Sequence, residues 1–214
     1  MGIRDATKTM LAQALDDLLK TTPLQKVSVK SLCEQCGAER QTFYYHFKDK
    51  YDLTQWMLFR DWDTALDMHG GIYSAEQLTS YLEIIRDRQL FYKRVYADEI
   101  NSLLPKFIFG QEAARIRSLV MEHLGVQTLS ETQELAVLYH VNGCIGTVIA
   151  WAHGGYRTPP QQLTGLHYAM LAALCGICVR FDITLRNANT VCMHKKHRSA
   201  CERSISLLPQ TMIY

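Results

Sequence analysis

Apolar residues recur every three or four positions along nearly the whole chain of 214 residues, and this spacing limits the fold more than any other property. In residues 5–20 the stripe consists of Met10, Leu11, Ala14, Leu15, Leu18 and Leu19. No segment alternates between apolar and polar residues as a half-buried strand does. The sequence therefore predicts an all-α protein of about nine helices, at residues 5–20, 29–36, 39–47, 51–68, 75–86, 88–104, 106–123, 131–153 and 160–179.

Proline and glycine residues mark the expected ends of these helices. Pro23 follows the first helix, Gly37 separates the second from the third, and Pro105 is expected to separate the sixth from the seventh. From about residue 180 the apolar stripe is lost, so an irregular or disordered tail is expected there. The chain is accordingly divided into three parts, residues 1–65, 66–180 and 181–214.

Charge is distributed unevenly over the chain, although the net charge is only +2. Residues 1–60 carry a net charge of +2, residues 61–175 carry −4, and residues 176–214 carry +4. Because an acidic region repels phosphate groups, a nucleic-acid site is expected in the first sixty residues.

Three features bear on the cellular compartment. The seven Cys residues show no small-disulfide-scaffold pattern, and the N-terminus lacks the apolar stretch of a secretory signal, so reduced thiols and a cytoplasmic location are expected. Residues 135–152 are apolar and just long enough to cross a membrane. They include His140, Asn142 and two glycines and have no flanking basic cluster, which favours a buried helix and no membrane association.

The segments at 29–36 and 39–47, joined at Gly37, have the spacing of a helix-turn-helix. One face can pack against the first helix through Leu32, Cys33, Cys36, Phe43 and Phe47. The opposite face presents Arg40, Gln41, Tyr44 and Tyr45, with Thr42 and His46 at its borders. Arg and Gln can pair with bases, and Tyr and His can reach phosphates. The alternative is an ordinary solvated face of a small helical subdomain.

The segment VSVKSLCEQCGAERQTFYYHFKDKYDL resembles the DNA-binding region of the TetR family of bacterial transcriptional regulators. The resemblance is carried by Gly37, the aromatic run at 42–47, the Lys48-Asp49-Lys50 break and Leu53, and it covers about residues 5–65. Phe91-Tyr92 and the stretch YHVNGCIGTVIAWAHGGYRTPPQQL are similar to a subgroup from Gram-positive bacteria that includes regulators associated with dihydroxyacetone kinase.

This resemblance implies a role for each matching residue. Ser28, Val29 and Lys30 match positions that touch backbone phosphates. Arg40, Gln41 and Thr42 match positions that read bases, and Tyr44, Tyr45, His46 and Lys50 match positions that hold phosphates. Two residues depart from the pattern: Glu39 replaces a common Ser or Thr cap, and Gln41 replaces the usual Gly or Pro.

The resemblance also implies the rest of the architecture. The three-helix domain at 1–65 is followed by a larger helical domain for ligand binding and dimerisation. The expected partners are a palindromic operator in double-stranded DNA, a second copy of the chain and a small-molecule effector. The predicted function is a ligand-responsive repressor, and the alternative is an activator that works with a partner co-activator protein. Five apolar residues at helical spacing form a seam: Leu163, Leu166, Met170, Leu174 and Ile177. This seam is the expected subunit contact, and the alternative is that it belongs to the internal core of one chain.

A helical enzyme or a protein-interaction module without DNA binding are remoter alternatives. The sequence contains no GxSxG, P-loop, GxGxxG or HExxH motif, so no catalytic residue and no cofactor are expected. Two CxxC pairs, Cys33/Cys36 and Cys175/Cys178, lie in apolar helical runs and are expected to behave as small hydrophobes. The tail holds zinc-compatible residues, but their spacing matches no known zinc finger, so no metal site is expected: Cys192, His194, His197 and Cys201.

Overall fold

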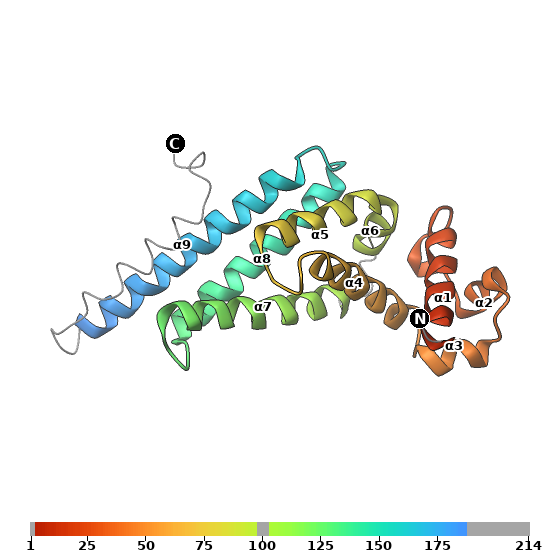
Figure 1. Ribbon diagram of the computed structural model, residues 1–214, viewed down its shortest axis with the longest axis horizontal. Helices are drawn as coiled ribbons and strands as arrows, with labels where there is room; N and C mark the ends of the chain where they lie inside the picture. Colours follow the sequence, from red (N-terminus) through yellow and green to blue (C-terminus); the bar gives the residue numbers. More distant parts are fainter. Residues whose placement is uncertain (1–2, 98–102, 188–214) are drawn as a thin grey trace. The chain divides into compact units, whose positions relative to one another are not determined.

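The computed structural model describes residues 3–97 and 103–187 of the chain. Within these ranges it contains nine α-helices, one short 3-10 helix and no strand, which confirms the all-α prediction (Figure 1). The elements are α1 (Ile3–Leu19), η1 (Leu24–Lys26), α2 (Val29–Cys36), α3 (Arg40–His46), α4 (Lys50–Asp67), α5 (Ala75–Asp87), α6 (Gln89–Tyr96), α7 (Leu103–Leu124), α8 (Glu131–His153) and α9 (Pro160–Asn187).

Three predicted boundaries were wrong. Helix α9 continues to Asn187, beyond the predicted end at 179, and residues 188–214 of the predicted tail lie outside the described residues. Helix α7 begins at Leu103, so Pro105 lies in its first turn, where the backbone N–H that proline lacks has no helical partner. Helix α6 ends at Tyr96, well before the predicted end at 104.

The described residues form two compact units. The first unit contains residues up to 108 together with 146–165, and the second contains 109–145 together with the remainder from 166. Helices α8 and α9 therefore each contribute to both units. The boundary expected near residue 65 falls inside the first unit and stays a prediction about function.

The core of the first unit joins the N-terminal helices to those that follow. Leu15 of α1, Leu32 of α2 and Phe43 of α3 have no exposed surface. The same cluster of buried residues includes Met57 of α4 and Tyr92 of α6. Since α3 has only seven residues, it is too short to be stable alone, and packing of this kind must hold it in place.

The core of the second unit lies between α7, α8 and α9. It consists of Ala113, Ile116, Val120, Val137, Val141 and Leu174. Leu174 is 5% exposed and therefore belongs to this core, whereas Leu166 and Met170 are about half exposed. Leu163 packs against the cluster of the first unit. The four described members of the predicted seam therefore face different surroundings, so the expectation of a single seam was wrong for them, and the side chain of Ile177 lies outside the described side chains.

Helix α8 is the one helix among the described residues that is long and apolar enough to cross a membrane, and 28% of its most apolar window is buried. Val137 and Val141 are fully buried, as expected of a core helix. Leu135 and Tyr139, in contrast, are 60% and 83% exposed. The predicted burial of α8 therefore applies to one of its faces.

Candidate nucleic-acid interface

The turn between α2 and α3 is fixed by local interactions that the sequence encodes. Ser28 caps α2: its side chain accepts a hydrogen bond from Ser31 N at 3.0 Å, and Ser31 Oγ accepts one from Ser28 N at 3.0 Å. Gly37 ends the helix with φ of 68°, a left-handed conformation that favours glycine. Ala38 N then donates to Cys33 O, which closes the turn before α3 begins at Arg40.

Helix α3 has an aromatic inner face and a polar outer face, as the sequence predicts. Phe43 is fully buried and Phe47 is 3% exposed. On the outer face Tyr44 and Tyr45 are 59% and 65% exposed. Such exposure of two neighbouring aromatic side chains is unusual for a helix of a globular protein. The outer face thus offers two phenolic hydroxyls to a partner.

The other residues assigned to α3 by the resemblance surround these tyrosines. Arg40 and Gln41 are exposed, whereas Thr42 and His46 are half-buried at the borders of the face. The His46 ring contacts the Tyr45 ring edge to face, with 5.0 Å between centroids. Glu39 stands at the N-cap without a side-chain capping bond, so its carboxylate is exposed beside the base-reading positions.

At the start of α2, two of the three side chains that the resemblance assigns to phosphate contacts are exposed, and the third packs against the core. Ser28 and Lys30 are exposed, and Lys30 lies 3.7 Å from Glu34 in a pair that is open to solvent on both sides. Val29 packs against the core, so its contribution to a phosphate contact would come from its backbone N–H.

Lys50 is placed differently from the phosphate-holding residue that the resemblance implies. Its ammonium group donates to three backbone carbonyls, those of Leu24 at 2.8 Å, Gln25 at 2.7 Å and Val27 at 2.8 Å. An ammonium group has three N–H donors, and all three are engaged within the fold. The geometry therefore favours a structural role, in which Lys50 ties the start of α4 to the loop that precedes α2.

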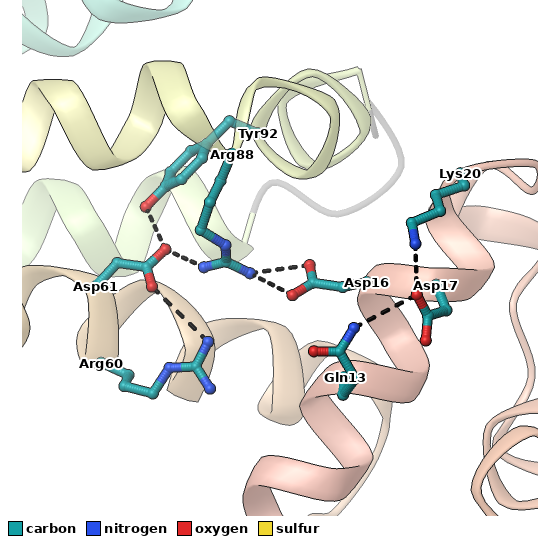
Figure 2. Close-up of polar contacts among 8 residues, drawn as sticks. All are labelled: Gln13, Asp16, Asp17, Lys20, Arg60, Asp61, Arg88 and Tyr92. Carbon is teal, nitrogen blue, oxygen red and sulfur yellow. Dashed lines mark hydrogen bonds and ion pairs between the residues drawn. The ribbon is translucent and has the colours of Figure 1, made fainter.

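A buried ionic network connects α1 with α4 and α6 (Figure 2). The Arg88 guanidinium donates through Nη2 to both carboxylate oxygens of Asp16 at 2.9 Å, and through Nη1 to Asp61. The Tyr92 hydroxyl donates to Asp61 at 3.0 Å, and Arg60 lies 3.9 Å from the same carboxylate. The Asp61 side chain is 6% exposed, so Arg88 neutralises a carboxylate that water does not reach.

Electrostatics in this network follow from burial. Burial raises the pKa of the Asp16 carboxyl, and the charge and hydrogen bonds of Arg88 oppose that rise. For Arg88 burial acts to lower the pKa, but the two carboxylates outweigh it and the net shift is upward. Burial also raises the pKa of the Tyr92 hydroxyl well above its usual value, so Tyr92 acts only as a neutral donor to Asp61.

Sequence reasoning did not find this network, although one signal was present. Asp61 lies three or four residues from Met57, Leu58 and Ala65, all of which are buried, so it occupies an apolar stripe. A charge in such a position needs a buried partner. No local pattern could have identified that partner as Arg88, which lies 27 positions away.

Metal-ligating side chains gather at one place among the described residues. His140 and Cys144 of α8 and His167 of α9 bring their ligand atoms within 4.8 Å of one another. The first CxxC pair is not such a place, because Cys33 is buried in the core and Cys36 donates to the carbonyl of Leu32. The zinc-compatible residues predicted in the tail lie outside the described residues.

Comparison with known proteins agrees with this architecture. Residues 11–55 match the family described as "Bacterial regulatory proteins, tetR family", and residues 74–172 match a "Transcriptional regulator C-terminal region" of the TetR type. The chain belongs to the TetR family. Proteins of this family are DNA-binding transcriptional regulators that dimerise.

Several individual proteins are similar to the chain. The HTH-type dhaKLM operon transcriptional activator DhaS of Lactococcus lactis is 26% identical over 117 residues, which cover 50% of this chain and 63% of DhaS, less than two thirds of its length. A solved structure of a dihydroxyacetone kinase operon activator DhaS has a TM-score of 0.57 at 17% identity, covering 80% of this chain and 97% of that one.

A TetR-family regulator from Streptomyces coelicolor has a TM-score of 0.57 at 18% identity, covering 98% of this chain and 92% of its own. At these identities the two structural similarities establish the fold. The expected resemblance to the TetR family, including its dihydroxyacetone-kinase-associated members, is thereby confirmed.

Proposed function

We propose that this protein binds a palindromic operator as a homodimer in the bacterial cytoplasm, with α3 of each subunit in the major groove. The observation that carries this proposal is the outer face of α3, where Arg40, Gln41, Tyr44 and Tyr45 are exposed on a helix anchored by Phe43. Arg supplies two donors for guanine, Gln supplies one donor and one acceptor for adenine, and the tyrosine hydroxyls supply phosphate contacts on either side.

The proposed division of labour follows the exposure of each residue. Arg40, Gln41 and Thr42 read bases, and Tyr44, Tyr45 and His46 hold phosphates. Ser28, Val29 and Lys30 contact the backbone through the N-terminus of α2, whose free N–H groups favour an anion. In this proposal Lys50 has a structural role. Its three hydrogen bonds to backbone carbonyls hold the start of α4 against the loop before α2, and this role replaces the expected contact with a phosphate.

The proposed subunit contact is the exposed apolar face of α8 and α9. Leu135 and Tyr139 of α8 and Leu166 and Met170 of α9 are each at least half exposed in the single chain. Several exposed apolar side chains on neighbouring helices are typical of a surface that contacts another protein. A second copy is the occupant, because proteins of this family dimerise and one α3 reads too few base pairs for specific binding.

The subunit contact can be tested by burying charge in it. Tyr139→Glu combined with Met170→Asp would place four unpaired charges in a two-fold interface, at several kcal/mol each. We expect a folded monomer by sedimentation and weak binding to a palindromic fragment. Met68→Asp is the matched control, since Met68 is 63% exposed at the end of α4 in the first unit, whereas the four proposed contact residues belong to the second, and it should leave the dimer intact. A double variant that remains dimeric would place the contact elsewhere.

For the regulatory outcome we propose repression that a small-molecule effector relieves, as in most members of the family. The second candidate is activation together with a partner protein, and the printed name of the Lactococcus lactis relative, a transcriptional activator, supports it. A reporter driven by the promoter beside the protein's own gene separates the two. Repression predicts higher expression when the gene is deleted, and activation predicts lower expression.

A further inference from the structure

Three metal-ligating side chains meet inside the second unit, although no sequence motif links them. His140 and Cys144 are four residues apart, which places them on one face of α8. His167 of α9 approaches the same point from the other helix. Cys144 Sγ lies 3.4 Å from His140 Nε2 and 3.3 Å from His167 Nδ1. The two imidazole rings lie 5.4 Å apart between centroids.

These distances match the edges of a metal coordination sphere. Zinc binds imidazole nitrogen at about 2.0–2.1 Å and thiolate sulfur at about 2.3 Å in tetrahedral geometry, so the nitrogen and sulfur ligands of one ion lie about 3.5 Å apart. Both observed nitrogen–sulfur distances are within a few tenths of an ångström of that value. All three ligand atoms lie within 4.8 Å of one another, and since two nitrogen ligands of one tetrahedral ion lie about 3.3 Å apart, ion binding requires the two imidazoles to move closer together.

The surroundings keep the three groups neutral. His140 is 8% exposed, and burial lowers its pKa. Burial, with the nearby His140 and Arg115, lowers the pKa of His167 to about 3, and burial raises the pKa of the Cys144 thiol to about 11. Burial thus favours the neutral form of each group, and the positions of the three ligand atoms carry the site.

We propose that His140, Cys144 and His167 form a binding site for a divalent ion of the zinc class. The ion forms bonds to two ring nitrogens and to Cys144 Sγ, the thiol proton is released to solvent, and a water molecule takes the fourth position. Three protein ligands with one open position suit reversible binding. The ion would join α8 to α9 in the second unit. This site does not depend on the proposed DNA contacts.

The test uses the full chain without a histidine tag, fully reduced, and titrated with Co²⁺ and then Zn²⁺. Tetrahedral Co²⁺ with one Cys ligand gives a sulfur-to-cobalt charge-transfer band, which Zn²⁺ removes by displacement. We expect one Zn²⁺-displaceable equivalent whose band is lost in Cys144→Ser. In His140→Gln and His167→Gln the affinity for Zn²⁺ should fall at least about 100-fold, more than the usual loss of an outer-shell partner.

Two variants serve as matched controls. Cys175→Ser changes a partly buried thiol on α9, and His153→Gln changes an exposed imidazole at the end of α8, so both should bind like the parent. Retention of the parental band and affinity in Cys144→Ser and both histidine variants would overturn the proposal, as would absence of Co²⁺ and Zn²⁺ binding by the parent. If the three variants retain the parental band and affinity, the metal is bound elsewhere in the chain.

A second measurement needs no variant and therefore does not depend on folding of a mutant. The parent is treated with a thiol-alkylating reagent with and without Zn²⁺, and modification is mapped by peptide mass spectrometry. We expect Zn²⁺ to slow alkylation of Cys144 at least tenfold and to leave the rate at Cys175 unchanged. Equal rates at Cys144 in both conditions would contradict the site.

Discussion

The buried network around Arg88 gives a prediction whose magnitude follows from the structure. Arg88→Met keeps an unbranched side chain but removes the guanidinium that bridges Asp16 and Asp61 and stacks over the Phe91 ring. Removing the main partner of a buried carboxylate costs up to about 3–5 kcal/mol, and here the Tyr92 hydroxyl and Arg60 remain beside Asp61. Asp61 is 6% exposed and carries most of this cost, whereas Asp16 is 25% exposed and water partly compensates it. We expect a loss of about 3 kcal/mol.

The loss can be measured in the first unit alone. All three tryptophans, Trp56, Trp62 and Trp151, belong to that unit, so tryptophan fluorescence during urea unfolding reports on it and not on the second unit. The matched control is Arg86→Met. Arg86 lies in the last turn of α5, two residues before Arg88, and pairs with Asp87, but the Arg86 and Asp87 side chains are 42% and 71% exposed. This control should change the free energy of unfolding by less than about 0.5 kcal/mol.

A double-mutant cycle distinguishes the network from simple loss of packing. Asp61→Asn alone leaves Arg88 paired with Asp16 and is expected to cost less than Arg88→Met. In the double variant no buried carboxylate remains at position 61, so much of the loss should be recovered, with a coupling free energy of at least about 1.5 kcal/mol. Additive losses within about 0.5 kcal/mol would refute the reasoning, because they would mean that Arg88 and Asp61 act independently.

Three further predictions concern other parts of the molecule. Arg40→Ala should cost about 1–3 kcal/mol on the operator and much less on random DNA in titrations at fixed salt; equal losses on both would make Arg40 a phosphate contact. Lys50→Met should lower the stability of the first unit by about 2 kcal/mol in urea, since it removes three hydrogen bonds from a charged donor; unchanged stability with a salt slope about one unit lower would restore its phosphate role. The Arg117 hydrogen bonds lower the pKa of Glu134, so this stabilisation is complete above the ordinary value of 4.5 and is lost as pH falls through the folded value. Because both side chains are about one-third exposed, Glu134→Gln should cost less than about 1 kcal/mol near pH 7, and this cost should shrink as pH falls below 4.5, by thermal unfolding followed by circular dichroism; a cost that is independent of pH would show a different origin.

The sequence by itself determined the order of the helices and the two faces of α3. Helical periodicity, the Ser28 cap and Gly37 act between residues a few positions apart, and such local interactions can be read without a fold. The same holds for the two faces of α3, because its buried and exposed residues alternate with the helical period from Phe43 to Phe47. A local rule also explains the error at the start of α7, since Pro105 interrupts a helix only when it lies beyond the first turn.

The tertiary structure decided everything that depends on residues far apart in the chain. Lys50 could not be assigned to the carbonyls of Leu24, Gln25 and Val27, nor Asp61 to Arg88, because a charge in a sequence does not specify its partner. Periodicity placed Met170 and Leu174 on one seam, yet packing turned Leu174 into the core and left Met170 exposed. His140, Cys144 and His167 become a candidate metal site only when α8 and α9 pack together. Helical spacing fixes which residues share a face, whereas the neighbour of that face is set by the fold.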